Sequence, residues 1–342
     1  MKGESRLRVI GYVLALGGVL LLTALIVREG AARVAAALAA ATWAFPAVAA
    51  INTPRLFSDG AAWQALIPKP NRPRFLVAVW VRWLGGSVND LLPFARLSAD
   101  ILTARLATIS AGLPPSLAAS VSVVNLTISV LMRILVTVAA ILLIAVATGR
   151  GNLFVPTLVA GLAAAVAVFG FYVLQRFGVV RLLAGLVSRL TKFSRLSSVL
   201  QRGVNFDHTV RTLYARRLAL LTSCSWWTFS WLVGCLQTWV TLFALGIQTS
   251  FIVALTIETA GQGVRSVLFI VPAGLGVFEG GIVMISSLFG ISGDSALALS
   301  LIRRATEVLF NGAGLLGWQI VEARRILGRL HPEVARSDVA RK

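Results

Sequence analysis

The stretches SVNDLLPFARLSAD (residues 87–100) and SVLFIVPAGLGVFE (residues 266–279) share one pattern, and this pattern decides the fold that we predict. Each places a proline (Pro93, Pro272) in an otherwise apolar segment and an acid (Asp100, Glu279) seven positions later. A broken backbone and a carboxylate are both costly in hydrocarbon, so they are rare unless protein or water surrounds them. One copy in each half predicts paired interrupted helices around a polar cavity, as in transporters with internal repeats. The alternative is that the prolines kink two ordinary helices.

The composition indicates a membrane protein. Hydrophobic residues make up 57% of the 342 residues and charged residues 13%, with a mean hydropathy of +0.85. A soluble domain carries roughly twice that share of charge. The first apolar run, residues 9–27, is too long for a typical signal-peptide core, so we interpret it as a retained span. We therefore predict an all-α, polytopic integral membrane protein with a single membrane domain over residues 1–342.

The net charge of +19 is concentrated in two segments, residues 176–217 and 323–342. Cytoplasmic loops carry an excess of Lys and Arg, so we expect both segments and the N-terminus to face the cytoplasm, in a bacterial inner membrane. Basic clusters beside a membrane also attract anionic lipid heads. The predicted partners are therefore membrane lipids, especially anionic ones, and not nucleic acid.

Hydropathy and charge together predict about six full spans and two re-entrant helical hairpins in an inverted internal repeat. The first half, residues 1–148, holds spans at 9–27, 43–67 (broken by proline) and 117–147, and a hairpin at 75–109. The second half, residues 149–175 and 218–322, holds spans at 153–174, 218–245 and 296–321, and a hairpin at 251–289. Residues 176–217 form a basic cytoplasmic loop with an interfacial helix at 181–198, and residues 323–342 a basic tail. If either hairpin crossed the membrane fully, every span after it would reverse its orientation, and the basic segments would no longer all face the cytoplasm.

The candidate binding residues are charged, polar or backbone-breaking side chains in or near the hairpins and the last span. Arginines outnumber the local acids there, and the planar guanidinium suits phosphate or carboxylate. The set is Arg82, Asn89, Asp90, Pro93, Arg96, Asp100, Arg105, Arg265, Pro272, Gly274, Gly276, Glu279, Arg303, Arg304 and Glu307. The spacing also predicts side-by-side pairs, Arg55/Asp59, Arg96/Asp100, Arg303/Glu307 and Arg304/Glu307, which could instead be self-neutralising and structural.

The run VPAGLGVFEGG (residues 271–281) is the most specific local sequence. Proline stops the preceding helix, glycine permits unusual backbone angles, and a helix that starts after such a break offers free N–H groups to an anion. The alternative is that these glycines serve helix packing only.

Few features support catalysis or metal binding. Cys224 and Cys235 are too far apart along one apolar segment for a disulfide. His208 and His331 fall in charged segments outside the predicted spans. The sequence contains no P-loop, zinc-protease motif or nucleophile elbow. We expect no catalytic residue, no metal and no cofactor.

The run PAGLGVFEGG (272–281), with Arg265-Ser266 before it and LSLIRR (299–304) after it, resembles the lysylphosphatidylglycerol synthase transmembrane-region family of flippase-like proteins. WVRW (80–83), Asn89, Pro93 and Ala95-Arg96 are similar to its hopanoid-biosynthesis-associated branch. The resemblance implies lipid translocation between leaflets rather than catalysis. Asp100 stands where the family leads us to expect glutamate, and Asn125 where it often has an acid, which weakens a proton-coupled role for both.

The leading hypothesis is a lipid flippase or transporter. Arg82, Arg96, Arg105 and Arg265 would draw a polar or anionic head group into the cavity, with Arg303 and Arg304 beside it. Asp100 and Glu279 would hold these arginines or release them on protonation. The first alternative is a membrane scaffold that recruits lipid- or hopanoid-biosynthesis enzymes through its basic surface. The second is an integral-membrane lipid transferase that uses Asp90, Asp100 or Glu279.

Overall fold

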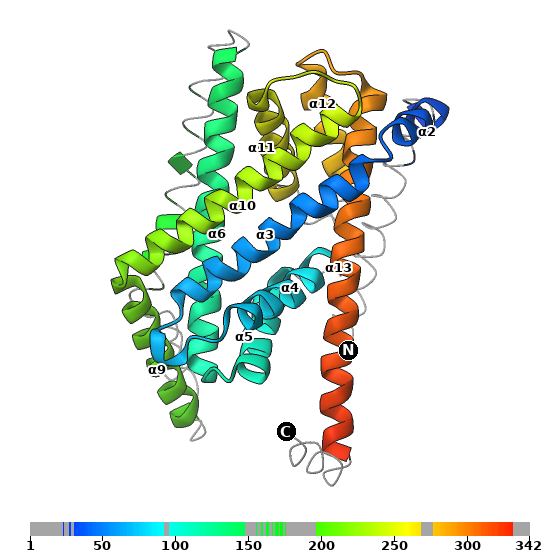
Figure 1. The fold of residues 1–342 in the computed structure, drawn as a ribbon. Coiled ribbons are helices and arrows are strands. Elements are labelled where there is room, and N and C mark those ends of the chain that lie inside the picture. Colours follow the sequence, from blue (N-terminus) through cyan, green and yellow to red (C-terminus); the bar gives the residue numbers. More distant parts are fainter. Residues whose placement is uncertain are drawn as a thin grey trace, which may run out of the picture.

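The structure is a computed structural model that describes residues 31–91, 96–147, 196–267 and 276–330, with scattered positions at 23–28 and 155–175. Every regular element in this part of the chain is helical (Figure 1), so the all-α prediction is confirmed for it. The elements are α2 (Ala31–Ala40), α3 (Ala44–Leu66), the 3-10 helix η1 (Lys69–Asn71), α4 (Phe75–Leu91), α5 (Arg96–Ala111), α6 (Pro115–Ala147), α9 (Leu196–Ala215), α10 (Arg217–Ala244), α11 (Phe251–Val267), α12 (Val277–Ser287) and α13 (Gly293–Leu330).

Two of the described helices are long and apolar enough to cross a membrane: residues Pro115–Ala139 of α6, and α10. The bent pair α2 and α3 makes a third if it is counted as one span. The spans predicted at 9–27 and 153–174 lie largely outside the described residues. The span predicted at 296–321 is helical within α13, but three charged residues in its centre, Arg303, Arg304 and Glu307, lower its apolar character. The six-span count and the inverted repeat stay predictions.

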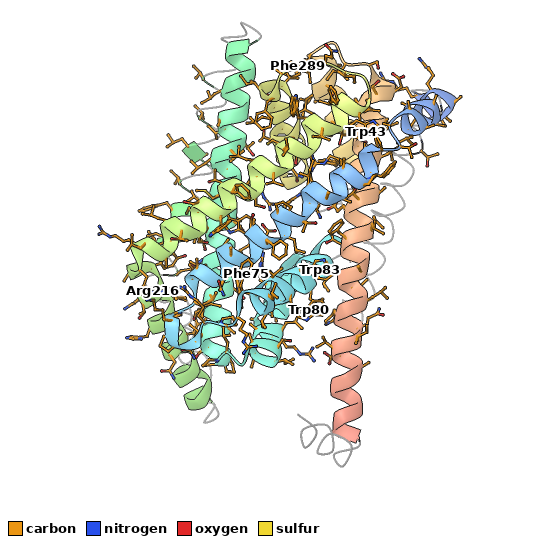
Figure 2. All side chains as sticks on the ribbon, in the orientation of Figure 1. Trp43, Phe75, Trp80, Trp83, Arg216 and Phe289 are labelled. Atoms are coloured by element: carbon orange, nitrogen blue, oxygen red, sulfur yellow. The ribbon has the colours of Figure 1, made fainter. Side chains whose placement is uncertain are left out.

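The predicted break at proline in residues 43–67 is wrong in its position. α3 continues through Pro54, and the chain bends by 68° between α2 and α3 instead. Figure 1 shows α3 lying along α10 for most of its length, with α6 and α13 upright on either side. This long contact compensates for the one hydrogen bond that proline removes from the helix. Arg216, the residue before α10 (labelled in Figure 2), donates a hydrogen bond of 2.8 Å to the Leu66 carbonyl at the end of α3.

Each predicted hairpin is a pair of helices packed against one another, α4 with α5 and α11 with α12. Gly85 of α4 lies so close to α5 that a Cβ there would be 2.1 Å from Thr103 Oγ1. Gly261 of α11 also lies close to α12, since a Cβ there would be 2.7 Å from Ile282 Cδ1. The connecting residues 92–95 and 268–275 lie outside the described part. Re-entry of either hairpin from one side of a bilayer stays a prediction.

Each hairpin contributes to a separate apolar core. One core joins the end of α3 to α4, α5, α6 and α9, and its largest buried side chains include Trp63, Leu84 and Leu106. The other joins α10 to α11, α12 and α13 through residues such as Ile257 and Ile282. Figure 1 shows α4 and α5 in its lower half and α11 and α12 in its upper half. The charged residues described below lie between the two cores.

The two basic segments are described in part. The interfacial helix predicted at 181–198 lies almost entirely outside the described residues and stays a prediction, and the central basic segment also contains α9 from Leu196 onward. α9 packs against α6. α13 continues to Leu330, so the segment predicted as a basic tail from residue 323 begins as helix. Its arginines do not interrupt the helix, because arginine is a good helix former.

Candidate functional site

A cavity of about 340 Å³ lies between the two cores, where α3, α4, α5, α6, α10, α11, α12 and α13 all contribute lining residues. Its walls carry charged side chains of both signs. They are Arg55, Asp59, Arg82, Asp100, Arg133, Arg303 and Glu307. Charged groups inside a membrane protein are costly and mark binding or transport paths by default. The cavity is therefore the candidate functional site.

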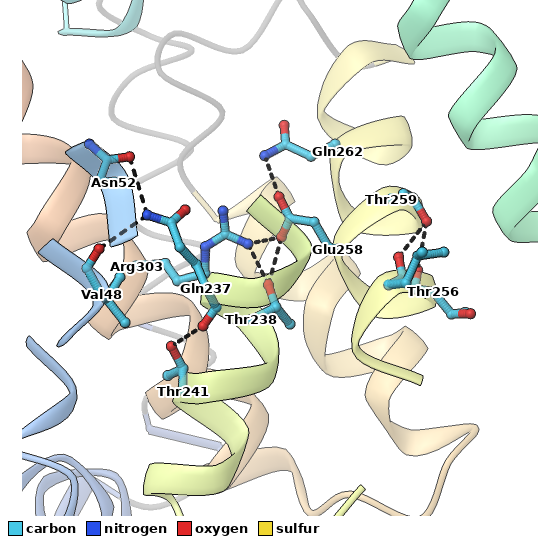
Figure 3. A network of polar contacts seen from close by, with 11 residues as sticks. Val48, Asn52, Gln237, Thr238, Thr241, Thr256, Glu258, Thr259, Gln262 and Arg303 are labelled. Atoms are coloured by element: carbon cyan, nitrogen blue, oxygen red, sulfur yellow. Dashed lines mark hydrogen bonds and ion pairs between the residues drawn. The ribbon is translucent and has the colours of Figure 1, made fainter. Parts of the chain in front are cut away.

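The α3 wall of the cavity is a polar stripe whose members recur every three or four residues. Gln237 of α10 donates hydrogen bonds to the Val48 carbonyl and to Asn52 Oδ1, both at 3.2 Å (Figure 3). About two turns further along α3, Asp59 accepts a hydrogen bond of 2.7 Å from Ser230 Oγ. Asp59 therefore does not form the predicted ion pair with Arg55, because the hydroxyl on α10 is its partner instead.

A buried ion pair links α13 to α11. The Arg303 Nη1 contacts Glu258 Oε2 and also donates to Thr238 Oγ1 of α10 at 2.6 Å (Figure 3). Thr238 donates in turn to Glu258 Oε2 at 2.8 Å, and Gln262 donates to Glu258 Oε1 at 3.3 Å. The spacing predicted Glu307 as the partner of Arg303, whereas the structure places Arg303 against Glu258, a residue that was outside the candidate set.

The neighbouring arginine links α13 to α12. Arg304 Nη2 lies 3.1 Å from Glu279 Oε1, and its Nη1 lies 3.3 Å from Glu307 Oε2, as the spacing of Arg304 and Glu307 predicted. Glu279 is fully buried in the first turn of α12, where the positive end of the helix dipole favours a carboxylate. α12 starts after Gly276, whose φ of 73° suits glycine. The two consecutive arginines thus fix both helices of the second hairpin to α13.

The first hairpin presents Arg82 and Asp100 to the cavity from α4 and α5. α4 is joined to α13 by neutral groups, since Trp83 Nε1 donates to the Phe310 carbonyl at 3.1 Å. Neither Arg82 nor Arg55 forms an ion pair in the described part of the chain. The Arg82 Nε is also enclosed without a hydrogen-bond partner there. These two guanidinium groups retain donors for a bound anion.

The structure brings only part of the candidate set together. Arg82, Asp100, Arg303 and Glu307 line the cavity, and Arg304 is joined to this lining by its contact with Glu307 and holds Glu279 in turn. Arg105 lies elsewhere, exposed and 2.6 Å from Glu322. Outside the described residues fall Pro93, Pro272, Gly274 and the side chains of Asn89, Asp90, Arg96 and Arg265.

Several polar residues that line or support the cavity lie outside the sequence-based set. Among them are Arg55, Asp59, Asn125, Gln237 and Glu258. The helical spacing of Asn52, Arg55 and Asp59 carries the signal that could have identified the α3 wall. In the described residues, no group of three or more His, Cys, Asp or Glu side chains could hold a metal ion.

Apolar helices of membrane-spanning length around a charged cavity define an α-helical membrane protein. The chain belongs to the family described as the lysylphosphatidylglycerol synthase TM region, whose profile matches residues 8–313. This membership relates the protein to membrane lipids. Comparison with curated proteins gave no match, and comparison with solved structures gave none either.

Proposed function

We propose that this protein is a lipid flippase or transporter, and that its cavity takes up a polar or anionic head group while the lipid tails stay in the bilayer. The observation that carries the proposal is the charged cavity with Arg55 and Arg82 on its wall, neither in an ion pair within the described residues. Arginine binds phosphate and carboxylate oxygens through two parallel hydrogen bonds. Such a site lowers the cost of moving a charged head group through hydrocarbon.

The dimensions and the outer surface support this division between head and tail. A volume of about 340 Å³ is at the lower end of the range for small-molecule pockets, which suits a head group and not a whole lipid. On α10, large apolar side chains face outward, with Leu218 81% and Phe243 60% exposed. Such residues contact lipid tails in a membrane-spanning helix.

The finer features belong to the same proposal. On this proposal the protein is not an enzyme, it lies in the bacterial inner membrane with both termini in the cytoplasm, and its partners are membrane lipids. The lipid is a phospholipid or, as the resemblance to the hopanoid-associated branch suggests, a hopanoid. Lipid-biosynthesis enzymes are candidate partners through the basic residues at the ends of the helices, such as Arg72 and Arg216, which cap the end of α3.

The test is a transport assay with purified protein in liposomes. A lipid with a fluorescent tail is placed in both leaflets, and a membrane-impermeant quencher measures how fast it moves to the outer leaflet. Arg82→Gln should slow movement by roughly tenfold or more, because a hydrogen bond to a charged group contributes about 1.5–3 kcal/mol. Arg74→Gln is the matched control, since Arg74 is exposed and lies outside the cavity. Movement at the rate of protein-free liposomes in the wild type would refute the proposal.

A further inference from the structure

Asn125 of α6 and Trp227 of α10 meet at the wall of the cavity. Trp227 Nε1 donates a hydrogen bond of 3.3 Å to Asn125 Oδ1, and both residues line the cavity. An indole N–H can only donate, whereas a side-chain amide has an acceptor end and a donor end. Because Trp227 occupies the acceptor end, the Nδ2 end of Asn125 is turned away from the indole.

The donor end of Asn125 opens to the cavity. Asn125 is only 1% exposed, and within the described residues Trp227 is its one side-chain hydrogen-bond partner. Its Nδ2 is nevertheless not among the described polar atoms that are enclosed without a partner. The small surface that Asn125 retains therefore lies at this nitrogen, on the side of the cavity. This nitrogen is therefore an N–H donor at the cavity wall, in addition to the guanidinium groups of Arg55 and Arg82 from two other helices.

We infer that Asn125, oriented by Trp227, is a specificity-determining residue that favours head groups presenting an anionic oxygen over head groups presenting an ammonium group. The inference rests on the proposed function, since it takes the cavity to be the head-group site. An N–H donor binds a phosphate or carboxylate oxygen and offers nothing to an ammonium group, which also only donates. A carboxylate at position 125 would reverse this preference.

The cavity contains acids as well as arginines, so its overall charge does not set the preference between head groups and the side chain of Asn125 does. Asp59 and Asp100 also line the cavity, so its walls do not exclude a positively charged group. Specificity is a difference between two affinities, and a site with both signs of charge leaves that difference small. At a buried position, replacing a hydrogen-bond donor by an acceptor lowers the affinity for an anionic head group and raises the affinity for an ammonium head group.

The test is equilibrium binding of two short-chain phospholipids, one phosphatidylglycerol and one phosphatidylethanolamine, to the purified full-length protein in detergent. Asn125→Asp should lower the ratio of the phosphatidylglycerol affinity to the phosphatidylethanolamine affinity by roughly ten- to a hundredfold. Trp227→Phe frees the amide to turn and should lower the same ratio by several-fold. Asn205→Asp is the matched control, because Asn205 is exposed on α9.

An unchanged ratio in Asn125→Asp, with thermal unfolding like that of the wild type, would overturn the inference. If Asn125→Asp does not fold, an unchanged ratio in Trp227→Phe overturns it instead. Binding in detergent requires no movement across a bilayer, so the two proposals fail separately. If Asn125→Asp shifts the affinity ratio but the wild type moves no lipid in liposomes, the proposed transport function is refuted and the inferred selectivity stands. If the wild type moves lipid but Asn125→Asp leaves the ratio unchanged, the selectivity is refuted and the transport function stands.

Discussion

The ion pair between Arg303 and Glu258 gives the largest expected effect of a single substitution on stability. The two side chains are 9% and 2% exposed, so removal of one leaves the other as a charge in a nearly water-free site. Breaking a buried pair in this way costs about 3–5 kcal/mol, whereas replacing both partners by uncharged groups of similar size costs far less. We therefore expect Arg303→Met to be strongly destabilising and to be largely rescued by Glu258→Gln, whose amide can still accept from Thr238.

The assay is unfolding of the purified protein in a fixed detergent, followed by tryptophan fluorescence for the wild type, both single variants and the double variant. The Tm shift is about 2–4 °C per kcal/mol for a chain of 150–250 residues and smaller for longer chains, so in this chain of 342 residues Arg303→Met should lower the Tm by roughly 5–10 °C. Together the four proteins form a double-mutant cycle, which isolates the interaction energy between Arg303 and Glu258. If the double variant unfolds at the temperature expected from adding the two single effects, the ion pair does not contribute as argued.

Two neighbouring pairs of residues provide further predictions, each with its own control. Gly85→Ala should destabilise the protein by about 1–3 kcal/mol, because the new Cβ would meet Thr103 at 2.1 Å. Gly86→Ala meets nothing within 4 Å and should be neutral or stabilising in the same unfolding assay; equal effects would argue against the tight contact of α4 and α5. A spin label at Phe243, 60% exposed, should collide with dissolved oxygen in the bilayer, and one at buried Leu242 should not. Equal collision rates would show that this face of α10 does not contact lipid.

Local features of the sequence were enough to predict most of the helices. The hairpins predicted at 75–109 and 251–289 correspond to α4 with α5 and to α11 with α12, and proline in each segment is the sequence signal that predicts a helix pair. The bend before α3 was missed because residues 41–43 contain neither proline nor glycine. Proline within residues 43–67 predicts a break, but α3 is continuous through Pro54, where its long contact with α10 supports the helix.

Side-chain partners were predictable only where they are neighbours in the sequence. Arg304 and Glu307 are three residues apart on one helix and form the predicted contact. Arg303 had the same kind of neighbour, yet its partner is Glu258, which comes from another helix. Spacing along one helix carries no information about which residue of another helix will face it. The cavity between the two cores therefore became apparent only when the helices were placed.

Photo-crosslinking shows whether the cavity receives the head group of a lipid. The protein is reconstituted with a phospholipid that carries a diazirine in its head group, irradiated, digested and mapped by mass spectrometry. We expect adducts on cavity residues such as Trp83 and Leu126, reduced when Arg82 is changed to Gln. Adducts confined to outward-facing residues such as Leu135 and Phe243, 51% and 60% exposed, would contradict it.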